Sequence, residues 1–423
     1  MDRLASVYFG KEDDLHVREL RHELHKHAEL EFDLPETKAI VEGELDRLKI
    51  PYTEKYAPCS VVAYLNYGAD AEAAPPVNTA GHVFTLAFRA DMDALPITEK
   101  SGVPFASVHE GIMHACGHDT HTAMLLGAAA ALKKAELDGA LGSLRIKLIF
   151  QPNEEGEETG SQVMIDNGVL EDTDIIFGQH IDMDTPTGTV LWIKGPAMAA
   201  CHSYNITFLG KKSHATQPQE GHDAIAMALK ACQDIYLMRA RELSPFTPNI
   251  VSVGAIHGGT AHNIICDRVE LKISTRFFHD EVAELLDSRI RQICEDAAAE
   301  LSGTVRIEDA ASTYAVTNDP AVTDLALAAA RKITTEDKIR EMHMRMGSED
   351  FSCFQRVRPG AFFHLGGSCP EKGCVGAVHN ETVVIDEDAF LTGSMLLVQL
   401  ALDMAAQPEN LDKSLESSGG AFS

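Results

Sequence analysis

The chain is poor in positive charge and has no long apolar runs. Its 423 residues include 36 lysines and arginines against 64 aspartates and glutamates, which gives a formal net charge of −28. Nucleic acids and anionic membranes bind basic surfaces, so this balance argues against both as partners. No segment approaches the roughly 20 apolar residues of a membrane span. The first residues, Met-Asp-Arg-Leu-Ala-Ser-Val, lack the apolar core of a secretion signal, and we expect a cytoplasmic protein.

The sequence also lacks the cysteine pattern of a disulfide framework. Its nine cysteines are an odd number and are scattered, so they are expected to be reduced thiols. Cys369 and Cys374 form a C-x4-C pair in a loop rich in glycine and proline. Two loop thiols are the favoured interpretation of this pair, and a structural zinc ion or a disulfide is the alternative.

The order of apolar segments predicts an α/β fold. With 45% hydrophobic residues, the chain can build one very large domain or two. Helical periodicity runs through residues 13–49 with a break at Pro35. Short apolar runs at 83–88, 144–150 and 174–177 are typical of buried strands, and a helix is expected between them, at about 120–135. This alternation favours a sheet with helices on its faces, and such sheets bind ligands at the carboxyl ends of their strands.

Residues 199–313 differ in pattern and are predicted to be an inserted domain. Strands at 203–209, 250–256 and 269–277 alternate with helices at 223–243 and 280–301, which suggests a β-α-β-β-α-β unit. The first of these helices is expected to bury an apolar stripe of Ile225, Leu229, Cys232 and Tyr236. The main domain is therefore split into residues 1–198 and 314–406, and the polar residues 407–423 are expected to be a disordered tail.

Five residues have side chains that bind divalent transition metals. Zinc-like ions accept the thiolate, imidazole and carboxylate groups of Cys116, His118, Glu155, His180 and His379. Glu154 is a spare carboxylate beside one of these ligands, and a metal-activated water needs such a proton acceptor. The simplest interpretation is a metallohydrolase.

Each of these residues also has an ordinary structural interpretation. Gly117 lets the backbone turn so that Cys116 and His118 can face one ion, but the same segment can be a plain turn before a helix that Asp119 caps. Asp93 follows a strand and can orient a metal-binding imidazole, or it can be a solvated carboxylate. Glu154 and Glu155 can belong to an acidic surface loop, and His180 and His379 can be hydrogen-bonded histidines with no ligand role.

The combination of motifs is more specific than any one of them. The sequence contains Arg-Ala-Asp-Met-Asp-Ala-Leu-Pro at 89–96, Met-His-Ala-Cys-Gly-His-Asp at 113–119, Phe-Gln-Pro-Asn-Glu-Glu at 150–155, Gly-Ser-Glu-Asp-Phe at 347–351 and His379-Asn380. In this order they resemble the amidohydrolase branch of the aminoacylase/carboxypeptidase metallopeptidases. That branch includes hippurate hydrolases, N-acetyl-diaminopimelate deacetylases and plant indole-acetyl-amino-acid hydrolases. The resemblance extends from about residue 20 to residue 402.

The resemblance implies a fold and a set of site residues. The fold is a mixed-sheet catalytic domain with an inserted smaller α+β lid domain, which often mediates dimerisation, so a homodimer or higher homo-oligomer is expected. The five donors become the ligands of two divalent ions (Zn, Mn or Co), and Glu154 becomes the general base and acid. The lid residues expected near the substrate are His214, Asn263 and Arg276, although Asn263 can instead cap a turn and Arg276 can be a surface strand residue. Several positions depart from the family pattern: Ala28, Asn153, Gln219 and Cys266.

The implied activity is hydrolysis of the amide bond of N-acyl amino acids or similar small amides by a metal-activated water. A dipeptidase or carboxypeptidase acting on small peptides is the alternative within the hydrolases. A non-catalytic relative that uses its lid for binding is the alternative of another class. Retention of Glu154 together with all five ligands favours an enzyme, whereas the departures in the lid leave the substrate open.

Overall fold

The computed structural model describes residues 4–68, 83–156 and 158–406, and the predicted tail at 407–423 lies outside them. The chain divides into two compact units. The larger unit contains Met1–Ala197, Thr317–His343 and Asp350–Ser423, and the smaller unit contains Met198–Val316 and Met344–Glu349. The sequence analysis placed residues 344–349 in the main domain. The structure groups them with the smaller unit because the Ala199 N–H donates to the carbonyl oxygens of Arg345 and Gly347, both at 2.9 Å.

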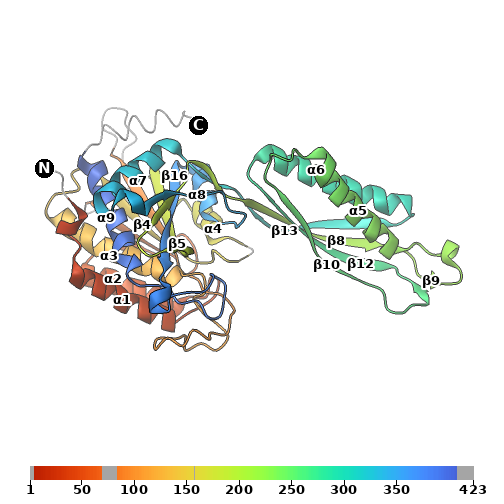
Figure 1. Cartoon of the computed structure of the whole chain (residues 1–423), viewed down its shortest axis with the longest axis horizontal. Coiled ribbons are helices and arrows are strands. Elements are labelled where there is room, and N and C mark those ends of the chain that lie inside the picture. The colour runs from red at the N-terminus through yellow and green to blue at the C-terminus, as the bar shows by residue number, and fades with distance from the viewer. Residues whose placement is uncertain (1–3, 69–82, 157, 407–423) are drawn as a thin grey trace. The chain divides into compact units, whose positions relative to one another are not determined.

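The larger unit is built on a mixed eight-stranded sheet, which confirms the predicted mixed-sheet α/β fold (Figure 1). Its strand order is β1-β2-β4-β3-β5-β16-β6-β15. Four central strands, β4, β3, β5 and β16, run parallel, so their carboxyl ends meet at one edge of the sheet. The strands are β1 (Tyr52–Thr53), β2 (Val61–Leu65), β3 (Thr85–Asp91), β4 (Arg145–Gln151), β5 (Ile175–Pro186), β6 (Val190–Trp192), β15 (Ile339–Glu341) and β16 (Gly360–Ser368).

Helices cover both faces of this sheet. On one face α3 packs against β3 and against its neighbours α1, α2 and α9, while α4 and α8 pack together on the other (Figure 1). The helices are α1 (Lys11–Lys26), α2 (Pro35–Leu48), α3 (His118–Leu137), α4 (Gly160–Asp166), α7 (Pro320–Ile333), α8 (Phe351–Val357) and α9 (Ala389–Ala406). Single 3-10 turns occur at η1 (Ala5–Val7), η2 (Pro218–Glu220), η3 (Glu336–Lys338) and η4 (Pro370–Lys372).

Helix α9 is the one candidate membrane span among the described residues, by length and hydropathy. The sequence analysis expected no such segment. Because 67% of this helix is buried inside the structure, against α3, α7 and β16, its apolar composition is that of a core helix.

Two local predictions in the larger unit are wrong. The strand predicted at 174–177 is too short, because β5 continues past His180 to Pro186, where β16 pairs with it and places His364 opposite His180. Asp119 was expected to be the N-cap of α3, but Gly117 holds that position and Asp119 lies in the first turn. There the buried Asp119 carboxylate accepts hydrogen bonds from Arg21 at 2.8 Å and from His25 at 2.7 Å, which joins α1 to α3.

The smaller unit is a four-stranded antiparallel sheet, in the order β10-β12-β8-β13, with two helices. Burial alternates along β12, as expected when one face of a sheet packs against helices and the other is open. The elements are β8 (Ala200–Leu209), β9 (Ser213–His214), α5 (Ala224–Glu242), β10 (Ile250–Gly258), β11 (Ile264–Ile265), β12 (Arg268–Phe277), α6 (Asp280–Glu300) and β13 (Thr304–Thr313). The short strands β7 (Gly195–Met198) and β14 (Val316–Asn318) pair with each other.

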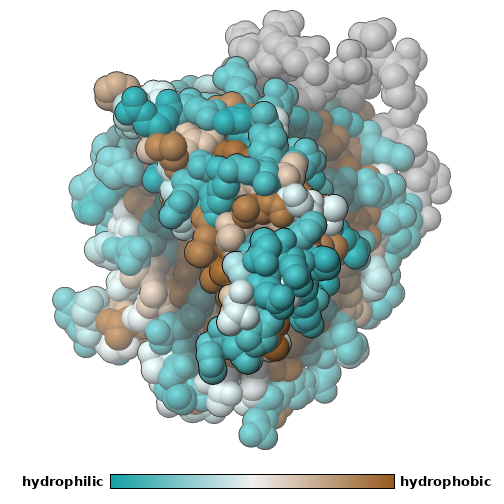
Figure 2. Space-filling model, turned by 90° about the vertical axis from the view of Figure 1, so that its right-hand side faces the viewer, coloured by the Kyte–Doolittle hydropathy of each residue, from teal (hydrophilic) through white to brown (hydrophobic). Residues whose placement is uncertain are grey.

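The predicted buried stripe of α5 lies on the wrong side of the helix. Ile225, Leu229 and Tyr236 are 37%, 53% and 47% exposed, and Cys232 is only half-buried. The buried face instead carries three alanines, two methionines and one isoleucine: Ala224, Met227, Ala228, Ala231, Ile235 and Met238. Alanines let the helix approach the sheet closely, and hydropathy alone gives them little weight. Apolar side chains are visible between hydrophilic ones on the molecular surface in Figure 2.

Two helical glycines allow the packing of the helices to be tested. A Cβ added to Gly127 of α3 would lie 2.4 Å from Val17 Cγ2, whereas one added to the exposed Gly43 of α2 would meet nothing within 4 Å. We expect Gly127→Ala to lower the free energy of unfolding by about 1–3 kcal/mol through overpacking. Gly43→Ala should raise it by up to about 1 kcal/mol, because alanine favours the helix. Urea unfolding measures both, and equal effects of the two substitutions would contradict the tight α1–α3 contact.

Candidate metal centre

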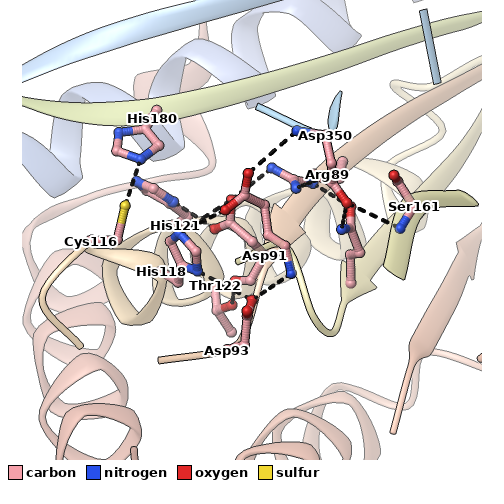
Figure 3. A network of polar contacts seen from close by, with 12 residues as sticks. Arg89, Asp91, Asp93, Cys116, His118, His121, Thr122, Ser161, His180 and Asp350 are labelled. Carbon is pink, nitrogen blue, oxygen red and sulfur yellow. Dashed lines mark hydrogen bonds and ion pairs between the residues drawn. The ribbon is translucent and has the colours of Figure 1, made fainter. Parts of the chain in front are cut away.

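The five predicted metal ligands converge in the larger unit, although four separate chain segments supply them. Cys116 precedes α3 and His118 is its first residue, while Glu155 follows β4. His180 lies in β5, and His379 lies in the loop that follows η4. Cys116 Sγ is 3.3 Å from His180 Nε2 and 3.3 Å from His379 Nε2, and the latter atom is 3.1 Å from Glu155 Oε1 (the Cys116–His180 contact is drawn in Figure 3).

Unusual backbone conformations bring these side chains together. Gly117 has φ +97°, and a Cβ there would lie 2.6 Å from Ile181 Cγ2, so the turn between Cys116 and His118 requires glycine. His379 has φ +61°, a left-handed conformation that a histidine rarely adopts. Its backbone N–H donates to the Ala115 carbonyl oxygen at 2.8 Å, which holds it beside the Cys116 loop. Such strained residues cluster at functional sites.

Cys116 belongs to two groups of potential ligands. In the set Cys116, His118 and His180, and in the set Cys116, Glu155 and His379, the donor atoms lie within 4.8 Å of one another. The same criterion also holds for two sets that contain His118, namely His118, Glu154, Glu155 and Asp91, His118, His121. The arrangement therefore offers two overlapping groups of donor atoms that could hold divalent ions.

The surroundings of His118 fit a cation better than they fit direct hydrogen bonds. Its side chain is fully buried, and its Nε2 atom is 3.9 Å from Glu154 Oε2 and 4.0 Å from Glu155 Oε1. These distances are too long for hydrogen bonds. Two donors bonded to one ion at roughly 2.0–2.2 Å cannot lie more than about 4.4 Å apart, so both separations leave room for a shared ion. Divalent ions thus fit the donor atoms present.

Burial and neighbouring charges set the protonation of the donors. Burial lowers the pKa of His180 well below its usual range, so the ring is neutral. Its Nδ1–H donates to the Ile181 carbonyl oxygen at 2.6 Å, which leaves the Nε2 lone pair facing Cys116. Burial raises the pKa of the Cys116 thiol. Hydrogen bonds to Cys116 and then to Glu155 raise the pKa of His379 to about 10.

Asp93 holds the Glu154–Glu155 segment beside His118. Its two carboxylate oxygens accept the backbone N–H groups of Glu154 and Glu155, each at 3.0 Å. Its Oδ1 atom is also 3.4 Å from His118 Nδ1. Glu154 is itself positioned by the Asp350 N–H, which donates to its Oε1 at 3.3 Å, so that Oε2 faces His118. The carboxylate of Glu154 is therefore fixed beside the donor cluster without being one of the five predicted ligands.

Asn153, which precedes Glu154, departs from the family pattern, and asparagine is compatible with the left-handed backbone conformation at this position. It has φ +54°, a conformation that asparagine tolerates better than most residues. Its amide donates to the Glu158 carbonyl oxygen at 2.5 Å, which closes the loop that carries the two glutamates.

A buried ionic network supports the centre, and its roles were missed by the sequence analysis (Figure 3). Arg89 donates to Asp91 and to Asp350, each at 2.7 Å, and to Gln151 at 2.7 Å. These four side chains are buried, and they connect β3 and β4 to the residue before α8. The family-like motifs at 89–96 and 347–351 contain Arg89 and Asp350, but neither motif shows that they are partners.

His121 connects this network to the strand of His180. Its Nδ1–H donates to Asp91 Oδ1 at 2.7 Å, and its Nε2 accepts the backbone N–H of Ile181 at 2.8 Å. A spacing of three residues places His118 and His121 on one face of α3, and this spacing was the signal that could have identified His121. His114, from the same sequence motif, is also buried, and burial lowers its pKa to about 3, so it is neutral.

The three predicted lid residues all lie in the smaller unit. The exposed His214 is in β9, and its Nδ1 atom is 2.8 Å from Thr216 Oγ1. Asn263 is brought beside this strand, because its carbonyl oxygen accepts the Ala215 N–H at 3.0 Å. Arg276 lies in a different sheet, on β12, and donates to the Ser348 hydroxyl at 2.7 Å. The structure thus brings His214 and Asn263 together and ties Arg276 to the 347–351 motif.

Known proteins share both the sequence and the fold. The chain is 35% identical over 395 residues to thermostable carboxypeptidase 2 of Saccharolobus solfataricus, which covers 93% of this chain and 96% of the relative. It is 32% identical over 390 residues to an N-acetylcysteine deacetylase of Bacillus subtilis, covering 90% and 95%.

Among solved structures, the YXEP protein of Bacillus subtilis, a dinuclear metal-binding peptidase of the M20 family, superposes with a TM-score of 0.76 and 28% identity. That similarity covers 94% of this chain and 99% of the YXEP chain. Residues 87–403, which contain every donor described above, match the model of one family of hydrolases. The chain therefore belongs to peptidase family M20/M25/M40.

Proposed function

We propose that this enzyme hydrolyses the amide bond of N-acyl amino acids or similar small amides with two divalent ions bound at the candidate metal centre. The observation that carries the proposal is the convergence of Cys116, His118, Glu155, His180 and His379 with Glu154 beside them. Asp93 supports it further, because its contacts suit a residue that orients His118 and the glutamate pair.

Divalent ions in this cluster would act as Lewis acids and lower the pKa of a water molecule toward about 7. Glu154 then has the role of general base: its Oε2 atom accepts the proton of the attacking water and returns it to the leaving amine. Asp350 N–H and Asp93 keep this carboxylate in place through the contacts described above. His214 and Asn263, which lie together in the smaller unit, are the proposed donors to the substrate carbonyl oxygen.

The choice of substrate has two candidates. The similarity to an N-acetylcysteine deacetylase supports N-acyl amino acids, and the similarity to a carboxypeptidase supports the alternative of a small peptide. Release of amino acids from a library of N-acyl amino acids and dipeptides, measured with the same enzyme, separates them. A non-catalytic role is disfavoured because Glu154 and all five donors are present.

The proposal extends to the metal, the assembly and the cellular location. Thiolate ligation favours zinc, while manganese and cobalt are the alternatives, and reconstitution of metal-stripped enzyme distinguishes them. The exposed apolar side chains of α5 support a homodimer or higher homo-oligomer formed through the smaller unit. A net charge of −28 argues against nucleic acids and anionic membranes as partners and supports small molecules, and a cytoplasmic location stays a prediction.

Substitution of Glu154 and of Glu155 should have different effects on turnover and on metal content. Glu154→Gln keeps the shape of the side chain but cannot accept a proton, so we expect normal metal content and a turnover at least ~100-fold lower. Glu155→Gln should lower the metal content itself, as should Cys116→Ala. Metal analysis and steady-state kinetics on the same preparations measure both properties, and equal metal loss in the two glutamine variants would contradict the assigned roles.

Metal affinity should rise with pH. The pKa values of three ligands, Cys116, His118 and His379, are raised, so all three groups are protonated at pH 7 and must lose a proton to bind an ion. His180 is already neutral and contributes no proton. We expect binding at pH 7 to release roughly two to three protons per chain, which calorimetry in two buffers of different ionisation enthalpy measures. Binding without proton release would contradict thiolate ligation by Cys116.

Arg276 is the proposed anchor for a substrate carboxylate. Its guanidinium can form two parallel hydrogen bonds to a carboxylate, a geometry that lysine cannot copy. Arg276→Lys should therefore lower kcat/KM for N-acyl amino acids. The loss of transition-state stabilisation should be about 1.5–3 kcal/mol. The matched control is the same substrate with its carboxylate capped as an amide, which should be affected little. An equal loss for both substrates would assign Arg276 a structural role through Ser348.

A further inference from the structure

Two cysteines outside the metal centre have a geometry that suits a disulfide. Cys369 and Cys374 stand at the two ends of a tight turn after β16, and both thiols are free. The Cys369 N–H donates to the Cys374 carbonyl oxygen at 2.8 Å, and the Cys374 N–H donates back at 3.1 Å. Such reciprocal bonds define an antiparallel pair with Cα atoms about 5.5 Å apart and with side chains on one face. A disulfide needs a Cα separation of about 4.4–6.8 Å, which such a pair meets, and a Cβ separation of about 3.5–4.5 Å. The Cβ atoms of directly opposite residues are about 4.5–5.5 Å apart, so the two cysteines must move slightly closer for the bond to form.

The turn between the two cysteines is anchored at its tip as well as at its base. Pro370–Lys372 forms a 3-10 turn, and Gly373 closes it with φ +76°. The Lys372 ammonium binds both carboxylate oxygens of Asp386, at 2.9 and 3.0 Å, and also contacts Asp388. These contacts hold the two cysteines opposite each other.

The two thiols differ in their access to solvent. Cys369 is half-buried, and its Sγ donates to Glu371 Oε2 at 3.5 Å. Cys374 is 9% exposed, and burial raises its pKa. Cys369 is therefore the thiol that an external reagent reaches first, and Cys374 is the thiol that can attack next from inside the turn.

We infer that Cys369 and Cys374 form a reversible disulfide by exchange with small disulfides of the glutathione class. The Cys369 thiolate attacks one sulfur of the small disulfide, so that a mixed disulfide forms and one small thiolate leaves. The Cys374 thiolate then attacks Cys369 Sγ, which forms the protein disulfide and releases the second small thiolate. The protein pair is oxidised, one small disulfide is reduced to two thiols, and the two cysteine protons end on those thiols.

The position of the pair connects this reaction to the metal centre. Cys374 precedes His379 by five residues, and the intervening Val375 carbonyl oxygen accepts the Val384 N–H at 3.0 Å. A closed ring at 369–374 therefore ties the start of the loop that carries His379. The buried Cys116 takes no part in the exchange, so the ligand set remains intact.

Peptide mapping of the full-length, metal-loaded enzyme tests the inference. The protein is incubated with glutathione disulfide, its remaining thiols are alkylated after unfolding, and it is cleaved with trypsin without reductant. Trypsin cuts after Lys372, so the disulfide should appear as two peptides joined through Cys369 and Cys374, two hydrogens lighter than their sum. Dithiothreitol should reverse the linkage, and Cys116 should remain fully alkylated.

Three variants make the test specific. Cys374→Ser should stop the reaction at a glutathione adduct on Cys369, and Cys369→Ser should react with glutathione disulfide at least about tenfold more slowly in this loop. Cys232→Ser, which removes another half-buried thiol on α5, should form the linkage as the wild type does. A lasting glutathione adduct on wild-type Cys369, or two thiols that stay alkylated at every concentration, would overturn the inference.

Discussion

Buried negative charge at the carboxyl ends of the central strands is the constraint around which the larger unit is organised. The side chains of Asp91, Asp93 and Asp350 are at most 1% exposed, and Glu154 and Glu155 lie beside them at 10% and 20%. A buried carboxylate costs several kcal/mol unless it is paired or hydrogen-bonded. The protein satisfies three of these acids internally. Arg89 binds Asp91 and Asp350, and Asp93 accepts two backbone N–H groups.

Glu154 and Glu155 both lie near His118 Nε2, and their positions define the metal centre. Glu155 Oε1 contacts the imidazole of His379. Glu154 Oε2 lies 3.9 Å from His118 Nε2, and Glu155 Oε1 lies 4.0 Å from the same atom. A cation placed among them would relieve the repulsion between the carboxylates and engage the buried ring of His118. The internal ion pairs thus keep Asp91, Asp93 and Asp350 occupied, so that the remaining donors are available to metal ions.

Much of this fold could be predicted from local patterns, because its central elements are strongly apolar or begin at clear signals. The strands at β3 and β4 and the helix at α3 lie within a few residues of their predicted positions, and the α+β pattern of residues 199–313 has its predicted order. The predictions that are wrong depended on distant partners. β5 continues past His180 because β16, nearly two hundred residues later, pairs with it. Asp119 turns away from the helix end because Arg21 of α1 needs a counter-charge in the core.

In the candidate site, too, contacts between distant residues could not be predicted from local patterns. Residue type and motif order were enough to propose the five donors and Glu154, because few other functions need that mixture of side chains. The supporting residues could not be derived in this way. Arg89 and Asp350 are 261 positions apart, and only the folded sheet shows that they form an ion pair. The face of α5 was mistaken for a related reason, since three of the residues that pack against the sheet are alanines, which a search for large apolar side chains passes over.

The 347–351 motif connects the proposed base to the proposed substrate anchor through the covalent chain. Asp350 donates its N–H to Glu154 and pairs with Arg89, while Ser348, two residues earlier, accepts a hydrogen bond from Arg276. Ser348 belongs to the smaller unit and Asp350 to the larger one, so the motif contains a boundary between the units. One five-residue motif thus supplies both the hydroxyl that Arg276 contacts and the N–H that positions Glu154, which explains why its residue types are restricted by both units.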